Sequence, residues 1–222
     1  MTATKISLLV AGLSMMWIAD VRGQSGGHDL PRAFRSLAGV TLNRDSAATI
    51  RAKLGNTRER RVGTARAAYV SWCYVMDKRS SHAVLELMSD ASDMGTPGRA
   101  LNVIRLRGDA PSEDRDGCAP LHASADLSTS AGLHLGLGVH AIEMLLGRPT
   151  RTTADSLIYD FDAKEYLPSD SPLYQAWDTS EYRESCFDAG PPYANVRAKV
   201  IVLLHDGRAT ELRIERYDQS VC

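Results

Sequence analysis

The feature that most constrains the fold of this chain is a short motif that occurs twice. The first copy reads Gly-Val-Thr-Leu at 39–42 and is followed by Ile-Arg-Ala-Lys-Leu-Gly at 50–55. The second reads Gly-Leu-His-Leu at 132–135 and is followed by Ile-Glu-Met-Leu-Leu-Gly at 142–147. The leading glycines are 132 − 39 = 93 positions apart in a chain of 222 residues. Recurrence on this scale indicates a duplicated unit, and it predicts repeat 1 over 37–125 and repeat 2 over 126–222.

Each repeat is predicted to contain one short helix followed by three strands. Ser46 can cap a helix that ends before Gly55, and a second helix over 139–146 ends before Gly147. The predicted strands cover 67–76, 82–88 and 100–107 in repeat 1, and 156–161, 199–204 and 211–217 in repeat 2. Asp206-Gly207 predicts an antiparallel hairpin between the last two strands. The predicted fold class is α+β: two tandem repeats, each a short helix or helical hairpin packed on an antiparallel sheet of about three strands.

The N-terminal residues 1–23 have the pattern of a secretory signal peptide. Lys5 precedes an uncharged run over 6–19, and small residues surround Gly23. The run is short for a membrane span, so we expect cleavage near Gly23 and a periplasmic or secreted mature chain without a transmembrane span. A buried N-terminal helix or an uncleaved anchor is the alternative. Residues 24–36, with Gly26-Gly27 and Pro31, predict a flexible leader.

The cysteine count favours two disulfides. An even number of cysteines in an exported chain is typical of disulfide bonding. Four cysteines allow three pairings, and the repeat favours one bridge within each copy, Cys73–Cys118 and Cys186–Cys222.

The motif and its context resemble a known fold. The leading Gly-x-x-Leu, the short helix that ends in Leu-Gly and the tandem arrangement are similar to beta-lactamase inhibitory protein and to the small outer-membrane assembly lipoproteins of the SmpA/OmlA type. The resemblance covers most of residues 38–218 and implies a non-enzymatic, extracytoplasmic, protein-binding module. The chain departs from the assembly lipoproteins because its first 23 residues contain no cysteine for lipid attachment.

Patterns typical of catalysis or metal binding are missing from the sequence. It has no Gly-x-Ser-x-Gly, His-Glu-x-x-His, Walker or dinucleotide motif, and we predict no catalytic residue, cofactor or metal. His134 and His140 lack a third ligand at a recognisable spacing. Asp160 and Asp162 lie on one face of a predicted strand, where a solvated sheet face competes with acid–base or calcium chemistry. The formal net charge of −1 gives no reason to expect nucleic-acid binding.

A long segment over 163–195 in repeat 2 is the first candidate binding surface. The surrounding residues 155–188 hold seven of the fourteen aromatic residues, and nine acids against two bases. Tyrosine and tryptophan on loops are typical of protein interfaces, so we predict partner contacts at Tyr166, Tyr174, Trp177 and Tyr182. The equal alternative is that these aromatics fasten the loop to its own sheet.

Residues 31–66 carry the opposite charge, with nine bases against two acids. Within them, Arg58, Arg60 and Arg61 are predicted to form an electrostatic docking patch for a protein or for an anionic envelope surface; a solvated surface is the alternative. We therefore expect an exported, non-enzymatic protein-binding or envelope interaction module. The alternative is an envelope enzyme or enzyme inhibitor whose site lies in the cleft between the repeats and uses Asp160 and Asp162. A structural protein held to the wall or membrane by charge is a third interpretation.

Overall fold

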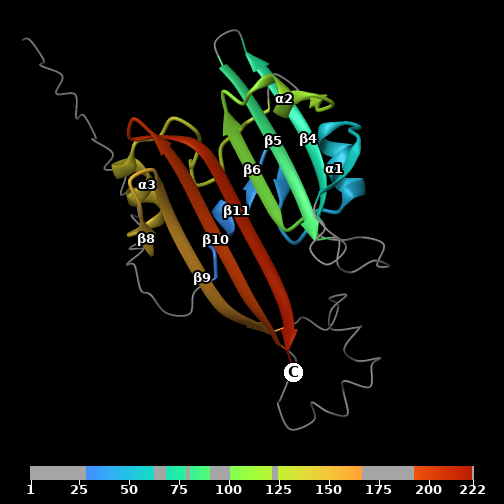
Figure 1. Cartoon of the computed structure of the whole chain (residues 1–222). Coiled ribbons are helices and arrows are strands. Elements are labelled where there is room, and N and C mark those ends of the chain that lie inside the picture. Colours follow the sequence, from blue (N-terminus) through green and yellow to red (C-terminus); the bar gives the residue numbers. More distant parts are fainter. Residues whose placement is uncertain are drawn as a thin grey trace, which may run out of the picture.

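A computed structural model describes residues 29–62, 69–78, 81–90, 101–121, 125–166 and 193–221 (Figure 1). These residues form one large sheet in the order β3-β4-β5-β6-β11-β10-β9-β8, with β7 beside β4 as the ninth strand. Neighbouring strands are antiparallel, except that β7 runs parallel to β4. The elements are η1 (Arg32–Phe34), β1 (Ser36–Leu37), β2 (Val40–Thr41), α1 (Ala47–Leu54), β3 (Glu59–Val62), β4 (Tyr69–Lys78), β5 (Ser81–Asp90), β6 (Val103–Gly108), α2 (Ser112–Arg115), β7 (Ala119–Pro120), α3 (Val139–Leu146), β8 (Arg151–Thr152), β9 (Ser156–Tyr166), β10 (Tyr193–His205) and β11 (Arg208–Val221).

The predicted fold class, α+β with two separate units of a helix on about three strands, is wrong. The structure has one nine-stranded sheet, because β6 and β11 pair with each other over Val103–Arg107 and Glu211–Glu215. Each of these strands would be an exposed edge in a separate three-stranded sheet, and exposed edges favour pairing. The junction between the two predicted repeats is thus a hydrogen-bonded strand pair within the described part of the chain, where a cleft was expected.

Several local predictions are confirmed. The second helix spans the predicted Val139–Leu146, and α1 begins after Ser46, whose Oγ accepts a hydrogen bond from the Thr49 N–H at 3.4 Å. Both helices end at a glycine with positive φ, 95° at Gly55 and 80° at Gly147, a conformation that glycine adopts without strain. The Asp206-Gly207 hairpin also forms, with φ of 50° and 71° at these residues, as a two-residue type I′ turn requires.

The hydrophobic core lies on one side of the sheet, the inner face, which α1, η1, β1, β2 and α3 cover. Alternation along the strands directs Tyr74 of β4, Leu106 of β6 and Val200 of β10 into this core, where Ile50 of α1 and Ile142 of α3 meet them. All five side chains are buried at 0% exposure. The two eight-residue helices α1 and α3 thus lie on this face, whereas the short helix α2 lies on the other.

The segment predicted as a flexible leader is described from Asp29 onward. Leu30 and Phe34 of this segment are buried in the core. Arg216 of β11, only 5% exposed, forms ion pairs with Asp29 at 3.2 Å and with Glu165 of β9 at 2.5 Å. Residues 29–36 are therefore packed against the sheet. The predicted signal peptide over 1–23 lies outside the described residues.

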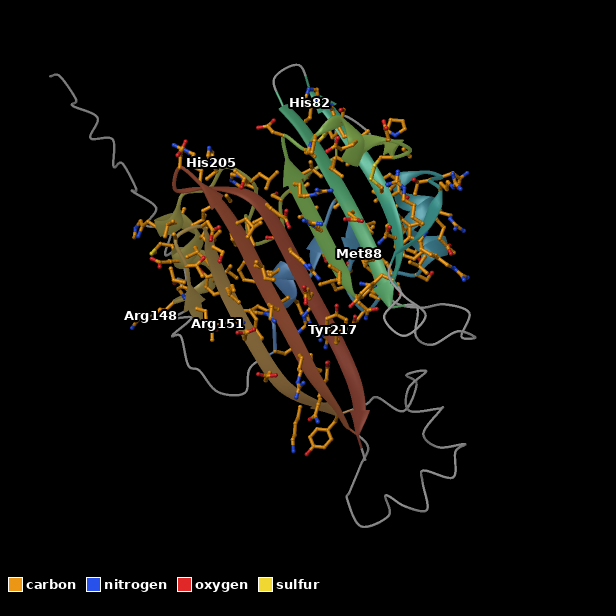
Figure 2. All side chains as sticks on the ribbon, viewed as in Figure 1. His82, Met88, Arg148, Arg151, His205 and Tyr217 are labelled. Carbon is orange, nitrogen blue, oxygen red and sulfur yellow. A yellow bond between two sulfur atoms is a disulfide. The ribbon has the colours of Figure 1, made fainter. Side chains whose placement is uncertain are left out.

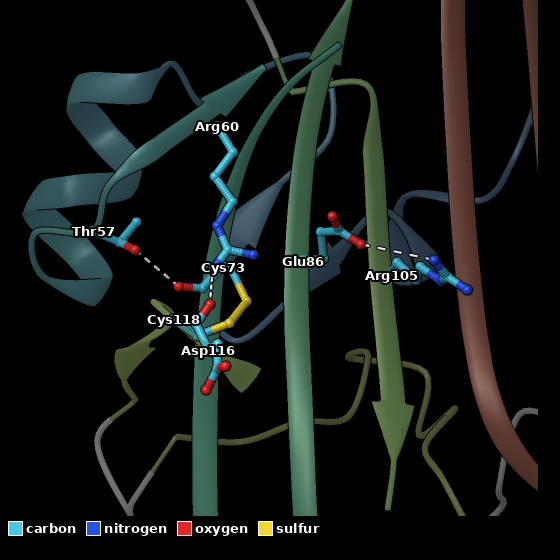
Figure 3. Close-up of a disulfide and its surroundings, with 7 residues drawn as sticks. All are labelled: Thr57, Arg60, Cys73, Glu86, Arg105, Asp116 and Cys118. Carbon is cyan, nitrogen blue, oxygen red and sulfur yellow. Dashed lines mark hydrogen bonds and ion pairs between the residues drawn. A yellow bond between two sulfur atoms is a disulfide. The ribbon is translucent and has the colours of Figure 1, made fainter. Parts of the chain in front are cut away.

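The disulfide Cys73–Cys118 is present, as predicted, and holds the α2 segment against the sheet (Figure 3). Cys73 of β4 points away from the main core, into a small cluster with Val84 of β5 and Ala110. Partly buried Val75 and Cys118 complete this cluster. The bridge therefore fastens the segment around α2 over the side of the sheet opposite the helices. The second predicted bridge, Cys186–Cys222, lies outside the described residues.

Candidate functional site

The candidate site is the outer face, which we define as the side of the sheet opposite α1 and α3. In Figure 1, α2 crosses the upper part of β5 and β4, whereas β6, β11 and β10 are unobstructed. Residues next to core positions point to this face because successive side chains in a strand alternate. Its described members from β5 to β9 are Val84, Glu86, Met88, Val103, Arg105, Arg107, Glu211, Arg213, Glu215, Tyr217, Arg197, Lys199, Ile201, Leu203, Ile158, Asp160, Asp162 and Lys164.

A row of ion pairs crosses the outer face from strand to strand. On β6, Arg105 contacts Glu86 of β5 at 3.8 Å (Figure 3). Arg105 also binds Glu211 of β11 through two hydrogen bonds of 2.7 and 3.0 Å. Further along, Lys199 of β10 lies 3.6 Å from Asp160 of β9. Opposite charges on neighbouring strands stabilise a sheet by roughly 0.2–1 kcal/mol a pair. The charges along this row therefore alternate in sign and largely neutralise one another.

Apolar side chains interrupt the charges at one end of the face. Ile201 of β10 lies directly opposite Ile158 of β9 in the register, and both are partly exposed. Leu203, two positions along β10, is 37% exposed. Protein interfaces contain apolar and charged side chains in proportions similar to the rest of the protein surface. The mixture on this face is therefore compatible with an interface.

A tyrosine pair, Tyr217 with Tyr69, lies toward the other end of the face. Figure 2 shows Met88 and Tyr217 on β5 and β11, the two strands that flank β6. Burial, the nearby charge of Glu215 and a hydrogen bond to Tyr69 all raise the pKa of the Tyr217 hydroxyl well above its usual range. The Tyr217 hydroxyl therefore stays protonated and is already hydrogen-bonded to Tyr69.

The two carboxylates singled out in the sequence, Asp160 and Asp162, do lie together on the outer face. Asp160 is 3.6 Å from both Lys199 and Arg151, and Asp162 is 3.8 Å from Arg197. The pair between Arg197 and Asp162 is largely exposed, and such pairs contribute about 0–1 kcal/mol. Both carboxylates thus have cationic neighbours on an open sheet surface.

The predicted arginine patch lies far from Tyr166, the one predicted aromatic contact among the described residues. Arg58, Arg60 and Arg61 belong to the β3 end of the sheet, whereas Tyr166 ends β9. Five strands separate β3 from β9 in the sheet order, a distance of roughly 29 Å at 4.8 Å per strand. The structure therefore places the arginine patch and Tyr166 on opposite flanks of the sheet.

The described residues of the arginine patch and of the predicted aromatic surface differ in exposure and in hydrogen bonding. Arg58 and Arg61 are exposed, but the Arg60 guanidinium donates a hydrogen bond to the Asp116 carbonyl (Figure 3). The Tyr166 side chain is 69% exposed. The other predicted contacts, Tyr174, Trp177 and Tyr182, lie outside the described residues, as does most of the predicted loop 163–195. The strands β9 and β10 extend into the ends of that loop, to Tyr166 and from Tyr193.

The two histidines singled out in the sequence, His134 and His140, are exposed. His134 Nδ1 lies 2.6 Å from the Leu135 carbonyl oxygen, and His140 is exposed on α3. In the ranges that the structure describes, no three His, Cys, Asp or Glu residues are grouped to hold a metal ion. None of the described helices is long and apolar enough to cross a membrane.

The outer face itself was missed in the sequence analysis, although a signal for it exists. In β11 the residues at 211, 213, 215 and 217 are charged or aromatic, whereas those at 212 and 214 are buried Leu and Ile. That alternation is typical of a sheet with one solvated face. The missing information was the order of the strands, which decides which charged residues become neighbours.

Comparison with known proteins finds no matching family model, no matching curated protein and no matching solved structure.

Proposed function

We propose that this protein is an exported, non-enzymatic binding protein that engages another extracytoplasmic protein through its outer face. The single observation that carries this proposal is the contrast between the two faces of the sheet. Both eight-residue helices, α1 and α3, lie on the inner face, while the outer face presents an aliphatic strip beside a row of paired opposite charges. A sheet face with this composition can bury apolar area and still match charges on a partner.

The outer face favours a partner of particular chemistry. Ile158, Ile201 and Leu203 offer an apolar centre, and the flanking side chains alternate between acidic and basic. A complementary surface would insert one or two aliphatic or aromatic side chains at the strip and present charges of both signs around them. A polyanion matches it less well, because four of its basic side chains already have acidic neighbours: Arg105, Arg197, Lys199 and Arg213.

Export is supported by the disulfide and by the N-terminal sequence pattern. Disulfides persist in oxidising compartments, and Cys73–Cys118 is formed. The pattern of residues 1–23 is that of a secretory signal.

The test compares two exposed apolar residues on opposite sides of the molecule. Ile201→Glu places a charge in the aliphatic strip, opposite Arg213 in the register, whose positive charge can pair with it. Met144→Glu makes the same kind of change on α3, where the native side chain is 70% exposed. We expect a cross-linked partner from envelope extracts of the source cells to be retained by wild type and Met144→Glu and lost by Ile201→Glu. Equal capture by both variants, at matched thermal stability, would refute the outer face as the binding surface.

A further inference from the structure

The free edge of β3 lies at the opposite end of the sheet from the aliphatic strip. On one side β3 pairs with β4 along its whole length, Glu59–Val62. No strand of the described part of the chain adjoins its other side, where the sheet order begins. An unpaired strand edge presents a row of N–H and C=O groups to which an extended chain can add.

Two hydrogen bonds show which backbone groups of β4 point toward β3. The Cys73 carbonyl accepts from Thr57 Oγ1 at 2.9 Å, and the Val75 carbonyl accepts from the Leu121 N–H at 2.7 Å. Thr57 leads into β3 and Leu121 follows β7, so both donors lie on the same side of β4. Because backbone groups alternate between the two edges of a strand, Ser71, two positions before Cys73, also directs its N–H and C=O toward β3.

The same alternation leaves Glu59 and Arg61 with their backbone groups on the free edge. Arg60 lies opposite Ser71 in the register and therefore uses its N–H and C=O within the β3–β4 pair. Its two neighbours in β3 point the other way. Both Glu59 and Arg61 are exposed, so this edge offers two N–H and two C=O groups.

The charge around this edge is strongly positive. Residues 51–62 contain five basic residues and one acid. Arg58 and Arg61 are exposed, and neither forms an ion pair with another described residue. The one acid, Glu59, already lies 3.3 Å from Arg51 of α1. The edge therefore attracts an acidic chain and repels a basic one.

We propose that the free edge of β3 binds an extended acidic segment of a partner protein, which adds to the sheet as a further strand. About four backbone hydrogen bonds to Glu59 and Arg61 would hold the segment. A carboxylate opposite Arg61 would supply the charge match, because opposite charges directly across a strand pair attract. The Arg60 side chain takes no part, since its guanidinium already donates to the Asp116 carbonyl (Figure 3).

The backbone groups favour a peptide strand over other anionic partners. An anionic membrane or polymer would use the same guanidinium charges but would leave the row of N–H and C=O groups without partners. The site is also separate from the outer face, which lies across the sheet on β5 to β9, so each of the two surfaces can be tested without the other.

Peptide titrations at low salt, followed by the NMR signals and hydrogen exchange of the Glu59 and Arg61 amides, test the strand addition. The probe is the blocked peptide Thr-Val-Asp-Val-Thr-Val-Asp-Val, which should shift both signals and slow both exchange rates. A second peptide carries lysine at both aspartate positions and tests the charge. A third keeps the aspartates but is N-methylated at every threonine and aspartate, which removes the N–H groups that would face β3. We expect neither comparison peptide to protect the two amides.

Variants of the protein test the role of the arginine. Arg61→Glu reverses the charge at the edge and should weaken binding of the acidic peptide about tenfold, while binding of the lysine peptide rises. Arg148→Glu is the matched control, because Arg148 is also exposed but lies between α3 and β8, at the other end of the sheet. This control should bind the acidic peptide as wild type does.

Four results would overturn the proposal. The first is equal binding of the N-methylated peptide, which would show attraction by charge alone. The second is an absence of protection at Glu59 and Arg61 at every peptide concentration, as it would be if another part of the same chain covered the edge. The third is an Arg61→Glu variant that binds the acidic peptide as well as wild type. The fourth is binding to phosphatidylglycerol vesicles with no binding of the acidic peptide, which would assign the arginines to a lipid surface.

Discussion

Removing the Cys73–Cys118 bridge should lower the stability of the protein by an amount that the structure allows one to work out. The two cysteines are 45 residues apart. Closing a loop of this length in the unfolded chain costs about 4 kcal/mol of conformational entropy at 25 °C. The double variant Cys73→Ala/Cys118→Ala frees the unfolded chain from that restraint and should lose most of this stability. The small apolar cluster with Val84 and Ala110 remains to hold part of the α2 segment.

Thermal unfolding followed by circular dichroism measures this loss. A domain of 150–250 residues shifts its Tm by about 2–4 °C for each kcal/mol, so we expect a fall of about 10 °C. Hydrogen exchange should rise most in the segment around α2, because the bridge fastens that segment to β4. A loss below about 1 kcal/mol, or exchange that rises evenly through the sheet, would refute the reasoning that the bridge restrains this segment.

Three further predictions follow from burial and backbone geometry, each measured by chemical or thermal unfolding. Ile142→Ala in α3 removes a fully buried side chain and should cost about 2–5 kcal/mol, whereas Met144→Ala on the exposed face should stay within about 0.5 kcal/mol; equal costs would contradict the placement of α3. Arg216→Met removes a buried cation that two carboxylates contact and should cost about 1–3 kcal/mol, because Asp29 keeps its ion pair with Arg35 and the Glu165 side chain is 48% exposed; a neutral effect would show that the ion pairs are dispensable. Burial, and secondarily the charge of Glu143, raises the pKa of Tyr159 to about 12, above the value of about 10 in an unfolded chain. Between pH 10 and pH 12 the folded state therefore keeps a proton that the unfolded chain releases. The contribution of this proton to the free energy of unfolding is complete below pH 10 and is lost as the pH rises to 12. Tyr159→Phe should flatten that decline, and an unchanged pH profile would contradict the assignment.

Local structure could be predicted from the sequence where a single residue type determines it. Ser46 caps α1, the glycines at 55 and 147 end the two helices, and Asp206-Gly207 makes the hairpin turn. Each of these features depends only on residues close together in the chain. The serine hydroxyl caps the helix end, and glycine, which lacks a side chain, adopts positive φ without strain.

The long-range arrangement could not be predicted in the same way. Nothing in the pattern of β6 or β11 distinguishes a sheet edge from a central strand, so their pairing, and with it the single sheet, was missed. The same limit applies to the outer face: Arg105 and Glu211 are 106 positions apart in the sequence and become partners only through that pairing. Asp160 and Asp162 were placed correctly on one face because strand alternation is local, but their cationic neighbours on β10 and β8 were not foreseen.

Site-specific photo-crosslinking in the source cells tests the proposed binding surface most directly. A photoreactive residue would be placed in turn at Ile158, Ile201 and Leu203 on the outer face, and at Met144 on α3 as the exposed apolar control. The account predicts one discrete adduct with the same protein from the three outer-face positions and none from Met144. An adduct at Met144, with none at any of the three outer-face positions, would contradict it.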